Sequence, residues 1–95
     1  MAAYIYADVE VIDPARYETY RQQVPALIAA HGGRYLVRGG AVEVLEGDRR
    51  PRRQVILEFP DMAHLKAFYT SSEYKTLIAI RQSASRGDLV AIEGV

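Results

Sequence analysis

Residues 31–40 read His-Gly-Gly-Arg-Tyr-Leu-Val-Arg-Gly-Gly, and this stretch decides how the chain turns. Glycine adopts backbone conformations that other residues avoid, so a segment this rich in glycine marks a turn, a bulge or a close approach. Gly32 and Gly33 stand where a helix would end, and the run from Arg34 stands where a strand would begin. The same ten residues hold one histidine and two arginines, which hints at a site but names no reaction.

The segment before this stretch predicts a strand followed by a helix. Residues 4–12 alternate apolar and polar side chains, which is the period of a strand. Asp13-Pro14 then supplies an N-cap and a proline at the first helical position. Apolar residues recur at helical spacing as far as Ala30, with Pro25 inside the run. Because proline lacks a backbone donor, we expect a kink near residues 21–24.

The segment after this stretch predicts three more strands and a second helical region. The strands are expected at 34–46 (interrupted by Gly39-Gly40), 53–59 and 89–93, with turns at 47–52 and 87–88 and helix starts at Pro60-Asp61 and at Ser71-Ser72-Glu73. The order β-α-β-β-α-β predicts one α+β domain over residues 1–95. We expect a ferredoxin-like sandwich, in which two helices cover one face of a four-stranded antiparallel sheet.

The composition excludes several classes of function. Twelve Lys and Arg balance twelve Asp and Glu, so no net charge attracts nucleic acid or an acidic membrane. Cysteine is absent, which removes disulfides, thiolate nucleophiles and cysteine-based metal sites and suits the cytoplasm. The N-terminal residues lack the basic region of a signal peptide, and no apolar run reaches the length of a membrane span. We therefore expect a cytoplasmic protein with no cofactor, metal, nucleic acid or membrane partner.

The expected strand pairing predicts an uncovered, partly apolar face. A hairpin centred on residues 49–50 sets Val42 opposite Leu57 and Val44 opposite Val55, which makes one purely apolar face for the helices to cover. The other face then holds Tyr4, Tyr6, Glu43, Ile56 and Glu58. Because a monomer seldom exposes such a patch to water, we expect a homodimer whose two sheets face each other.

The position of Arg38 depends on where the second strand is interrupted. In a regular strand Arg38 would share the core face with Val42 and Val44, and an unpaired guanidinium in a small core is costly. A bulge at Gly39-Gly40 reverses the phase, so we expect Tyr35 and Val37 in the core and Arg38 on the open face. There Arg38 would lie near Glu58.

Arg38, Glu58 and Tyr6 form the best candidate constellation, because they combine an anion anchor, a carboxylate and a phenol. The plainer alternative is an Arg–Glu pair that joins strands or subunits. His31 is a candidate general base, or else a histidine that interacts with the end of its helix. Arg81 either reaches the pocket or lies at its rim.

Other charged and aromatic side chains have plainer interpretations. Tyr17, Tyr20, Tyr69 and Tyr74 lie at helical spacing and are expected in the core or an interface. The arginines at 49, 50, 52 and 53 straddle the expected hairpin and suggest a solvated turn. His64 is expected at the surface.

The chain resembles the DUF1330 family of domains of unknown function, within the dimeric α/β-barrel superfamily. The residues that carry the resemblance are Asp13-Pro14 with Tyr17 and Tyr20, the block 31–40, Leu45-Glu46-Gly47, Glu58-Phe59-Pro60, Ser71-Ser72-Glu73-Tyr74 with Arg81, and Glu93-Gly94. The resemblance covers almost the whole chain and implies a ferredoxin-like subunit in a homodimer. The family implies no activity, but its motif coincides with His31, Arg38, Glu58, Tyr74 and Arg81, which favours a shared cleft.

Two hypotheses of function follow. In the first, the protein binds or transforms a small anionic or carbonyl-bearing metabolite without a cofactor. Arg38 anchors an oxygen, Glu58 or His31 moves a proton, and Tyr6, Tyr74 and Arg81 bind the substrate. In the second, the protein is a non-catalytic dimeric binding or stress-related accessory protein, and these polar residues are structural. A haem or metal enzyme with His31 as ligand is a weaker third alternative.

Overall fold

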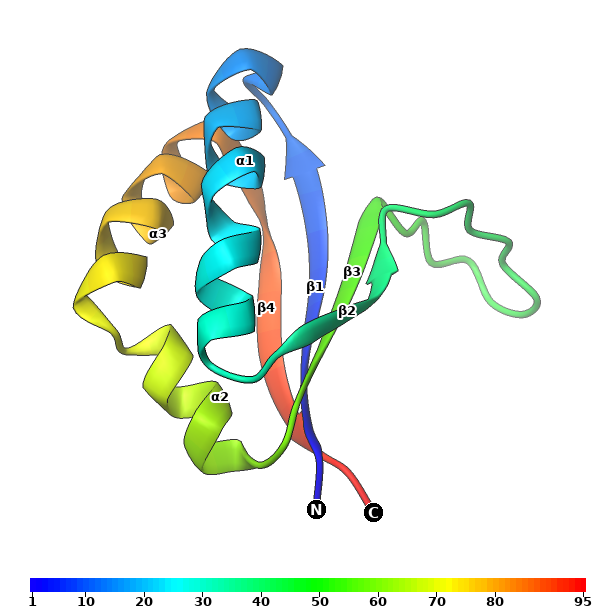
Figure 1. Cartoon of the computed structure of the whole chain (residues 1–95). Coiled ribbons are helices and arrows are strands. Elements are labelled where there is room, and N and C mark those ends of the chain that lie inside the picture. The colour runs from blue at the N-terminus through cyan, green and yellow to red at the C-terminus, as the bar shows by residue number, and fades with distance from the viewer.

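Four strands and three helices follow one another in the computed structural model, which describes residues 1–95. In chain order they are β1 (Ala3–Val11), α1 (Pro14–Ala30), β2 (Arg34–Arg38), β3 (Arg53–Phe59), α2 (Met62–Tyr69), α3 (Ser72–Ala84) and β4 (Ser85–Glu93). The strands form one antiparallel sheet in the order β2-β3-β1-β4. All three helices lie on one side of it (Figure 1), so the predicted α+β, ferredoxin-like fold is confirmed.

The helices begin where the sequence places their caps. The side chain of Asp13 accepts a hydrogen bond from the backbone N–H of Arg16, and Pro14 occupies the first turn of α1. Asp61 caps α2 in the same way, and Ser71 caps α3. The second helical region is therefore two helices, because Ser71 starts a new one. None of the helices has both the length and the hydropathy needed to cross a bilayer.

The core lies between the sheet and the helices. Ala3, Ile5, Ala7 and Val9 of β1 are buried on the core side, and of the residues between them only Asp8 is buried as well. α1 adds Tyr17, Tyr20, Val24 and Ile28, and the aromatic rings of Phe59, Phe68 and Tyr74 are almost fully enclosed.

The last strand begins earlier than the sequence suggests. β4 starts at Ser85, and Gly87 and Asp88 pair with β1 rather than forming a turn. A Cβ atom at Gly87 would overlap the carbonyl oxygen of Asp8. This glycine is needed for the close approach of two strands, not for a change of direction.

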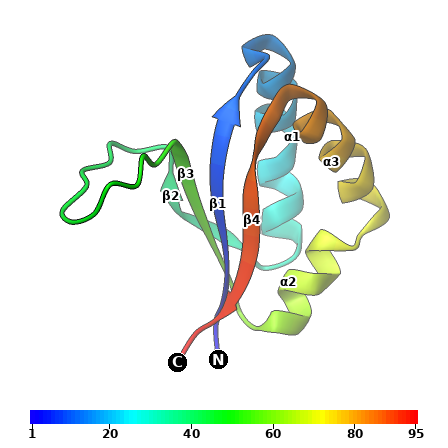
Figure 2. The same cartoon turned by 180° about the vertical axis from the view of Figure 1, so that it is seen from behind.

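The second strand is shorter than predicted, and residues 40–52 form an irregular arm. Gly39 has a φ angle of +69° and donates its N–H to the carbonyl of Gln54, after which the strand pairing stops. The arm projects away from the body of the protein (Figures 1 and 2). The predicted pairing of Val42 with Leu57 and Val44 with Val55 is therefore wrong, and both valines are about half exposed.

The bulge in β2 exists, but it lies before Arg38. Tyr35 pairs with Leu57, Val37 pairs with Ile56 and Arg38 pairs with Val55, so the extra residue sits between Tyr35 and Val37. Tyr35 faces the core as predicted. The shift leaves Val37 opposite an open-face residue and returns Arg38 to the helix side, so the predicted positions of both are wrong.

The opposite face of the sheet is uncovered. Its apolar side chains form a shallow depression lined by Tyr4, Tyr6, Leu36, Ile56 and Ile92. Val90 and Ile92 are about half exposed. This is the uncovered face that the sequence predicts, with Leu36 and the side chains of β4 added to it and without Glu43, which belongs to the arm.

Candidate functional site

A cavity with a volume of about 50 Å³ lies between α1 and the inner face of the sheet. A single water needs about 10–15 Å³ of such volume, so the cavity accommodates a molecule of only a few non-hydrogen atoms. Its apolar lining comes from β1, β3, β4 and α1. The side chains that surround it are Ile5, Ala7, Val9, Tyr17, Tyr20, Arg21, Val24, Ile28, Tyr35, Arg38, Arg53, Val55, Leu57, Tyr74 and Leu89.

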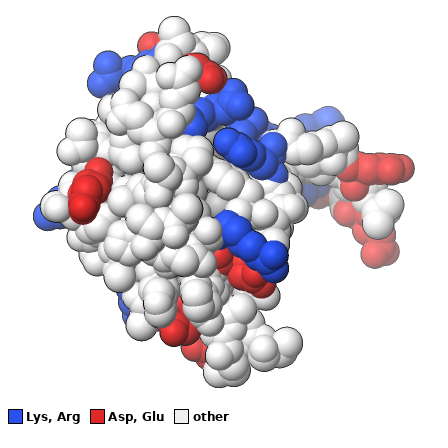
Figure 3. Space-filling view, in the orientation of Figure 1, with Lys and Arg blue, Asp and Glu red and all other residues white.

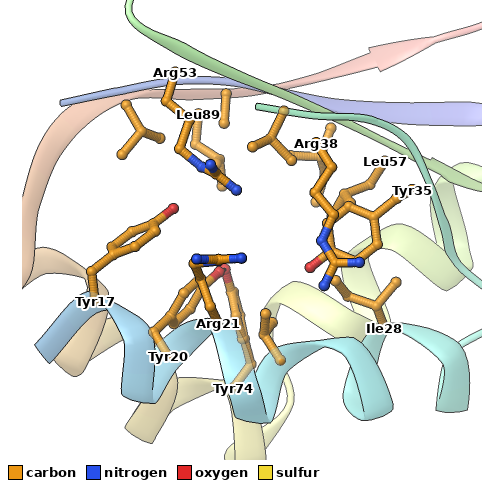
Figure 4. Close-up of a pocket in the computed structure, with 15 residues that line it drawn as sticks. Tyr17, Tyr20, Arg21, Ile28, Tyr35, Arg38, Arg53, Leu57, Tyr74 and Leu89 are labelled. Carbon is orange, nitrogen blue, oxygen red and sulfur yellow. The ribbon is translucent and has the colours of Figure 1, made fainter. Parts of the chain in front are cut away.

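Three arginines from three different elements converge on this cavity. Arg21 comes from α1, Arg38 from the end of β2 and Arg53 from the start of β3; the guanidinium groups of Arg21 and Arg53 reach toward the centre, and that of Arg38 lies at one side, against the Tyr35 ring (Figure 4). Basic side chains are also seen together on this face, between α1 and the arm, while acidic side chains gather on the arm itself (Figure 3). No aspartate, glutamate or histidine lines the cavity.

Two of these arginines have no carboxylate partner. Arg21 forms an ion pair of 2.9 Å with Glu18, whereas neither Arg38 nor Arg53 forms any salt bridge within the chain. The Nε atom of Arg53 is buried and has no hydrogen-bond partner. An unsatisfied buried donor on a charged group is costly, so Arg53 has an unmet requirement for an acceptor, whereas Arg38 is exposed and brings a second unpaired charge to the same cavity.

Tyrosine rings hold the two unpaired guanidiniums in place. The Cζ atom of Arg38 lies 4.3 Å from the centre of the Tyr35 ring, and that of Arg53 lies 6.0 Å from the centre of the Tyr17 ring. Both distances are within the range of cation–π attraction. The stacking positions the charges without neutralising them.

Gly39 makes the inward path of Arg53 possible. A Cβ atom at this position would overlap the Arg53 guanidinium, and the positive φ angle of +69° is itself unfavourable for other residues. The glycine therefore has two roles, because it turns the chain into the arm and leaves space for the arginine.

Two phenols at the bottom of the cavity are hydrogen-bonded to each other. The hydroxyl oxygens of Tyr20 and Tyr74 are 2.8 Å apart. Burial raises the pKa of both hydroxyls, and the neighbouring phenol raises that of Tyr20 further. Burial also raises the pKa of Tyr35. These phenols stay protonated near neutral pH, so they are donors and not bases.

The structure separates the residues of the predicted constellation. Arg38 lines the cavity, but Glu58 lies on the open face, where its carboxylate accepts hydrogen bonds from Arg34 at 2.7 Å and from the Tyr4 hydroxyl at 3.3 Å. The predicted proximity of Arg38 and Glu58 is wrong, because the bulge before Arg38 sends the two side chains to opposite faces. Tyr6 is also on the open face, beside Gln54.

The remaining predicted site residues are distributed differently. Tyr74 lines the cavity, and Arg81 lies behind it, close enough to the Tyr74 hydroxyl to oppose the effect of burial on its pKa. His31 follows the last turn of α1 and contacts Phe68 edge-on, with the ring centres 6.0 Å apart. It does not line the cavity.

Sequence reasoning misses Arg21 and Arg53 as site residues. It places Arg53 in a solvated turn, yet this residue has the same parity as Val55 and Leu57, which are on the core side of β3. Arg21 is one helical turn from both Tyr17 and Val24, on the side that faces the core. These two spacings are the signals that could have found them.

Two other arginines secure the base of the arm. The buried carboxylate of Asp8 accepts hydrogen bonds from Arg52 at 2.7 Å and from Gln54 at 2.8 Å, and Arg49 approaches to 3.8 Å. The hydrogen bonds from Gln54 and Arg52 lower the pKa of Asp8. The sequence predicts a solvated turn for this run, and that prediction is wrong for Arg49 and Arg52, which contact Asp8.

Nowhere does the chain gather three or more side chains of the kinds that hold a metal ion.

Solved structures confirm the fold class. A protein of unknown function from Rhodopseudomonas palustris, RPA0582, superposes with a TM-score of 0.80 at 17% identity, over 99% of this chain and 82% of that one. SnoaB, a cofactor-independent oxygenase from Streptomyces nogalater, superposes with a TM-score of 0.60 at 12% identity, over 99% and 92%. An antibiotic biosynthesis monooxygenase gives 0.53 at 17% identity, over 100% and 99%.

Sequence comparison assigns the family. A search of curated proteins finds none that matches the chain. A family model matches residues 2–95, and the chain therefore belongs to the family described as domain of unknown function DUF1330.

Proposed function

We propose that this protein binds a small organic acid in the cavity of each subunit of a homodimer. The observation that supports binding is the pair of unpaired guanidiniums, Arg38 and Arg53, which face one cavity that contains no acidic side chain. A carboxylate supplies the acceptors that these groups lack, and arginine binds carboxylates with paired, charge-assisted hydrogen bonds.

The lining defines the rest of the ligand. Apolar side chains from the sheet and α1 form most of the cavity wall, so the ligand has a short apolar body attached to its acidic group. The small volume excludes nucleotides and polycyclic compounds. The positive side chains at the rim attract anions from solution.

The lining favours binding and polarisation over proton transfer by the chain itself. Arginines and protonated phenols stabilise negative charge on an oxygen, but no carboxylate or imidazole is present to act as a base. Glu58 and His31, the predicted bases, lie outside the lining. The binding hypothesis therefore has more support than cofactor-free acid–base catalysis.

The homodimer is proposed from the open face of the sheet and from the arm. The face exposes Tyr4, Tyr6, Leu36, Ile56 and Ile92 to solvent with no element over them. Leu45, on the arm, is 86% exposed. Two apolar surfaces that one subunit leaves uncovered would be buried together if a second copy covered them.

Titration with short carboxylates tests the binding proposal. Propionate should stabilise the wild-type protein in thermal unfolding and shift amide signals of the cavity residues in NMR spectra. Arg53→Gln should reduce the affinity about tenfold or more, since a hydrogen bond to a charged group contributes about 1.5–3 kcal/mol. Arg86→Gln removes the same charge from an exposed site outside the cavity, and it should leave the affinity unchanged. Equal affinities for the two variants would contradict the proposal.

A further inference from the structure

The two hydroxyl groups that meet in the cavity have two hydrogens to donate but form only one hydrogen bond. Tyr20 and Tyr74 have two O–H groups and a single hydrogen bond between them, with 2.8 Å between their oxygens. No other protein acceptor bonds to either hydroxyl. Both rings line the cavity, and both are buried. One O–H is therefore left without an acceptor, on a ring that lines the cavity.

Arg81 sets the direction of this pair. Its guanidinium lies beside the Tyr74 hydroxyl, on the α3 side and outside the cavity lining. Arginine only donates, so its positive charge beside Tyr74 favours a hydroxyl hydrogen that points away from Arg81. The only acceptor that the Tyr74 hydroxyl meets in that direction is the Tyr20 oxygen, 2.8 Å away. The favoured direction therefore runs from Tyr74 to Tyr20, and from Tyr20 into the cavity.

We propose that the Tyr20 hydroxyl binds a carbonyl oxygen of the ligand, and that the ligand class is short-chain oxo acids. This inference rests on the proposed binding of an organic acid. The carboxylate occupies Arg38 and Arg53, and the second oxygen meets Tyr20. A ketone oxygen only accepts hydrogen bonds, which suits a lining whose guanidiniums only donate and whose phenols remain protonated.

In this arrangement Arg81 is a positioning residue. It does not line the cavity, and it acts on the ligand through Tyr74. Its removal should change the preference for the carbonyl without abolishing binding of the carboxylate.

Pyruvate and propionate test the assignment, because they share a carboxylate and differ in the ketone oxygen. NMR titration of the full chain at pH 7 gives both dissociation constants. The wild type should bind pyruvate about three- to tenfold more tightly, which corresponds to one net hydrogen bond. Tyr20→Phe should bring this ratio close to one while propionate still binds. Tyr69→Phe removes a hydroxyl outside the cavity lining, and it should leave the ratio unchanged.

Variants behind the cavity provide a second readout. Arg81→Gln should lower the ratio in part, and Arg81→Lys should restore it, because lysine keeps the positive charge beside Tyr74. Tyr74→Phe removes the donor to the Tyr20 oxygen, so it should also lower the ratio in part, and a ratio that stays at the wild-type value in both Arg81→Gln and Tyr74→Phe would contradict the assignment even if Tyr20→Phe does not fold.

The outcomes separate the two proposals. If neither acid binds the wild type, or if Arg53→Gln binds both as the wild type does, the proposed function fails. If both acids bind the wild type equally, or if Tyr20→Phe keeps the preference, the oxo-acid assignment fails and the carboxylate site stands.

Discussion

The guanidinium of Arg53 occupies the space that a side chain at position 39 would fill, and the residue there is Gly39. A Cβ atom at position 39 would force the end of the Arg53 side chain to shift from its place in the cavity. Gly39 also has a φ angle of +69°, whereas the adjacent Gly40 does not have a positive φ, and a Cβ atom added to Gly40 would meet nothing within 4 Å. Two neighbouring glycines thus differ in what the structure requires of them.

Gly39→Ala should therefore destabilise the protein and weaken ligand binding. An alanine with positive φ costs about 1–3 kcal/mol, which corresponds to a fall in Tm of at least ~4 °C for a domain of this size. The displaced Arg53 should reduce carboxylate affinity as well. Calorimetry and NMR titration measure the two effects. Gly40→Ala is the matched control and should change neither quantity, so equal effects at both positions would contradict this role of Gly39.

Asp8 should link the stability of the fold to pH. Hydrogen bonds from Gln54 and Arg52 lower its pKa below the ordinary value of 3.8. A carboxylate whose pKa is lowered by folding stabilises the folded state above its unfolded pKa, and that contribution is lost as the pH falls through the folded value. Asp8→Ala should cost about 1–3 kcal/mol at pH 7.

Urea unfolding at several pH values measures this linkage. The difference between the wild type and Asp8→Ala should be constant above about pH 5 and should shrink as the pH falls below about 4. Glu10→Ala is the control, since Glu10 is half exposed and approaches Arg52 only to 3.7 Å. Its cost should stay within about 1 kcal/mol. A difference for Asp8→Ala that grows in acid would contradict the assigned direction.

The parts of the fold that the sequence predicts rest on local chemistry. Asp13, Asp61 and Ser71 cap helices at their predicted positions, and the alternation in residues 4–12 identifies β1. Each of these signals depends on residues a few positions apart. The local preferences of these residues are kept in the folded protein because the sheet and the helices require the same local structure.

The side on which Arg38 lies depends on one residue of offset, and the sequence does not signal it. Gly39-Gly40 has the composition of a bulge, but the bulge forms at Leu36, where no glycine marks it. A shift of one residue reverses the face of every later side chain. The cost of an unpaired arginine on the core side also favours the open face. That argument assumes that the core side is closed to solvent. In the structure Arg38 lines a cavity, lies against the Tyr35 ring and remains exposed, so its charge on this side is not buried.

Ile56→Glu should convert the proposed homodimer into a monomer. Ile56 lies in the depression on the open face, beside Tyr6 and Leu36, and a charge there cannot be buried against a second copy without a partner. Sedimentation equilibrium at micromolar concentrations should give a dimer for the wild type and a monomer for the variant, with similar circular dichroism for both. Ile12→Glu makes the same substitution at a half-exposed position outside this face, and it should leave the dimer intact. A wild-type protein that sediments as a monomer of 10.6 kDa would contradict the homodimer. A dimer that tolerates glutamate at position 56 would place the interface on another surface.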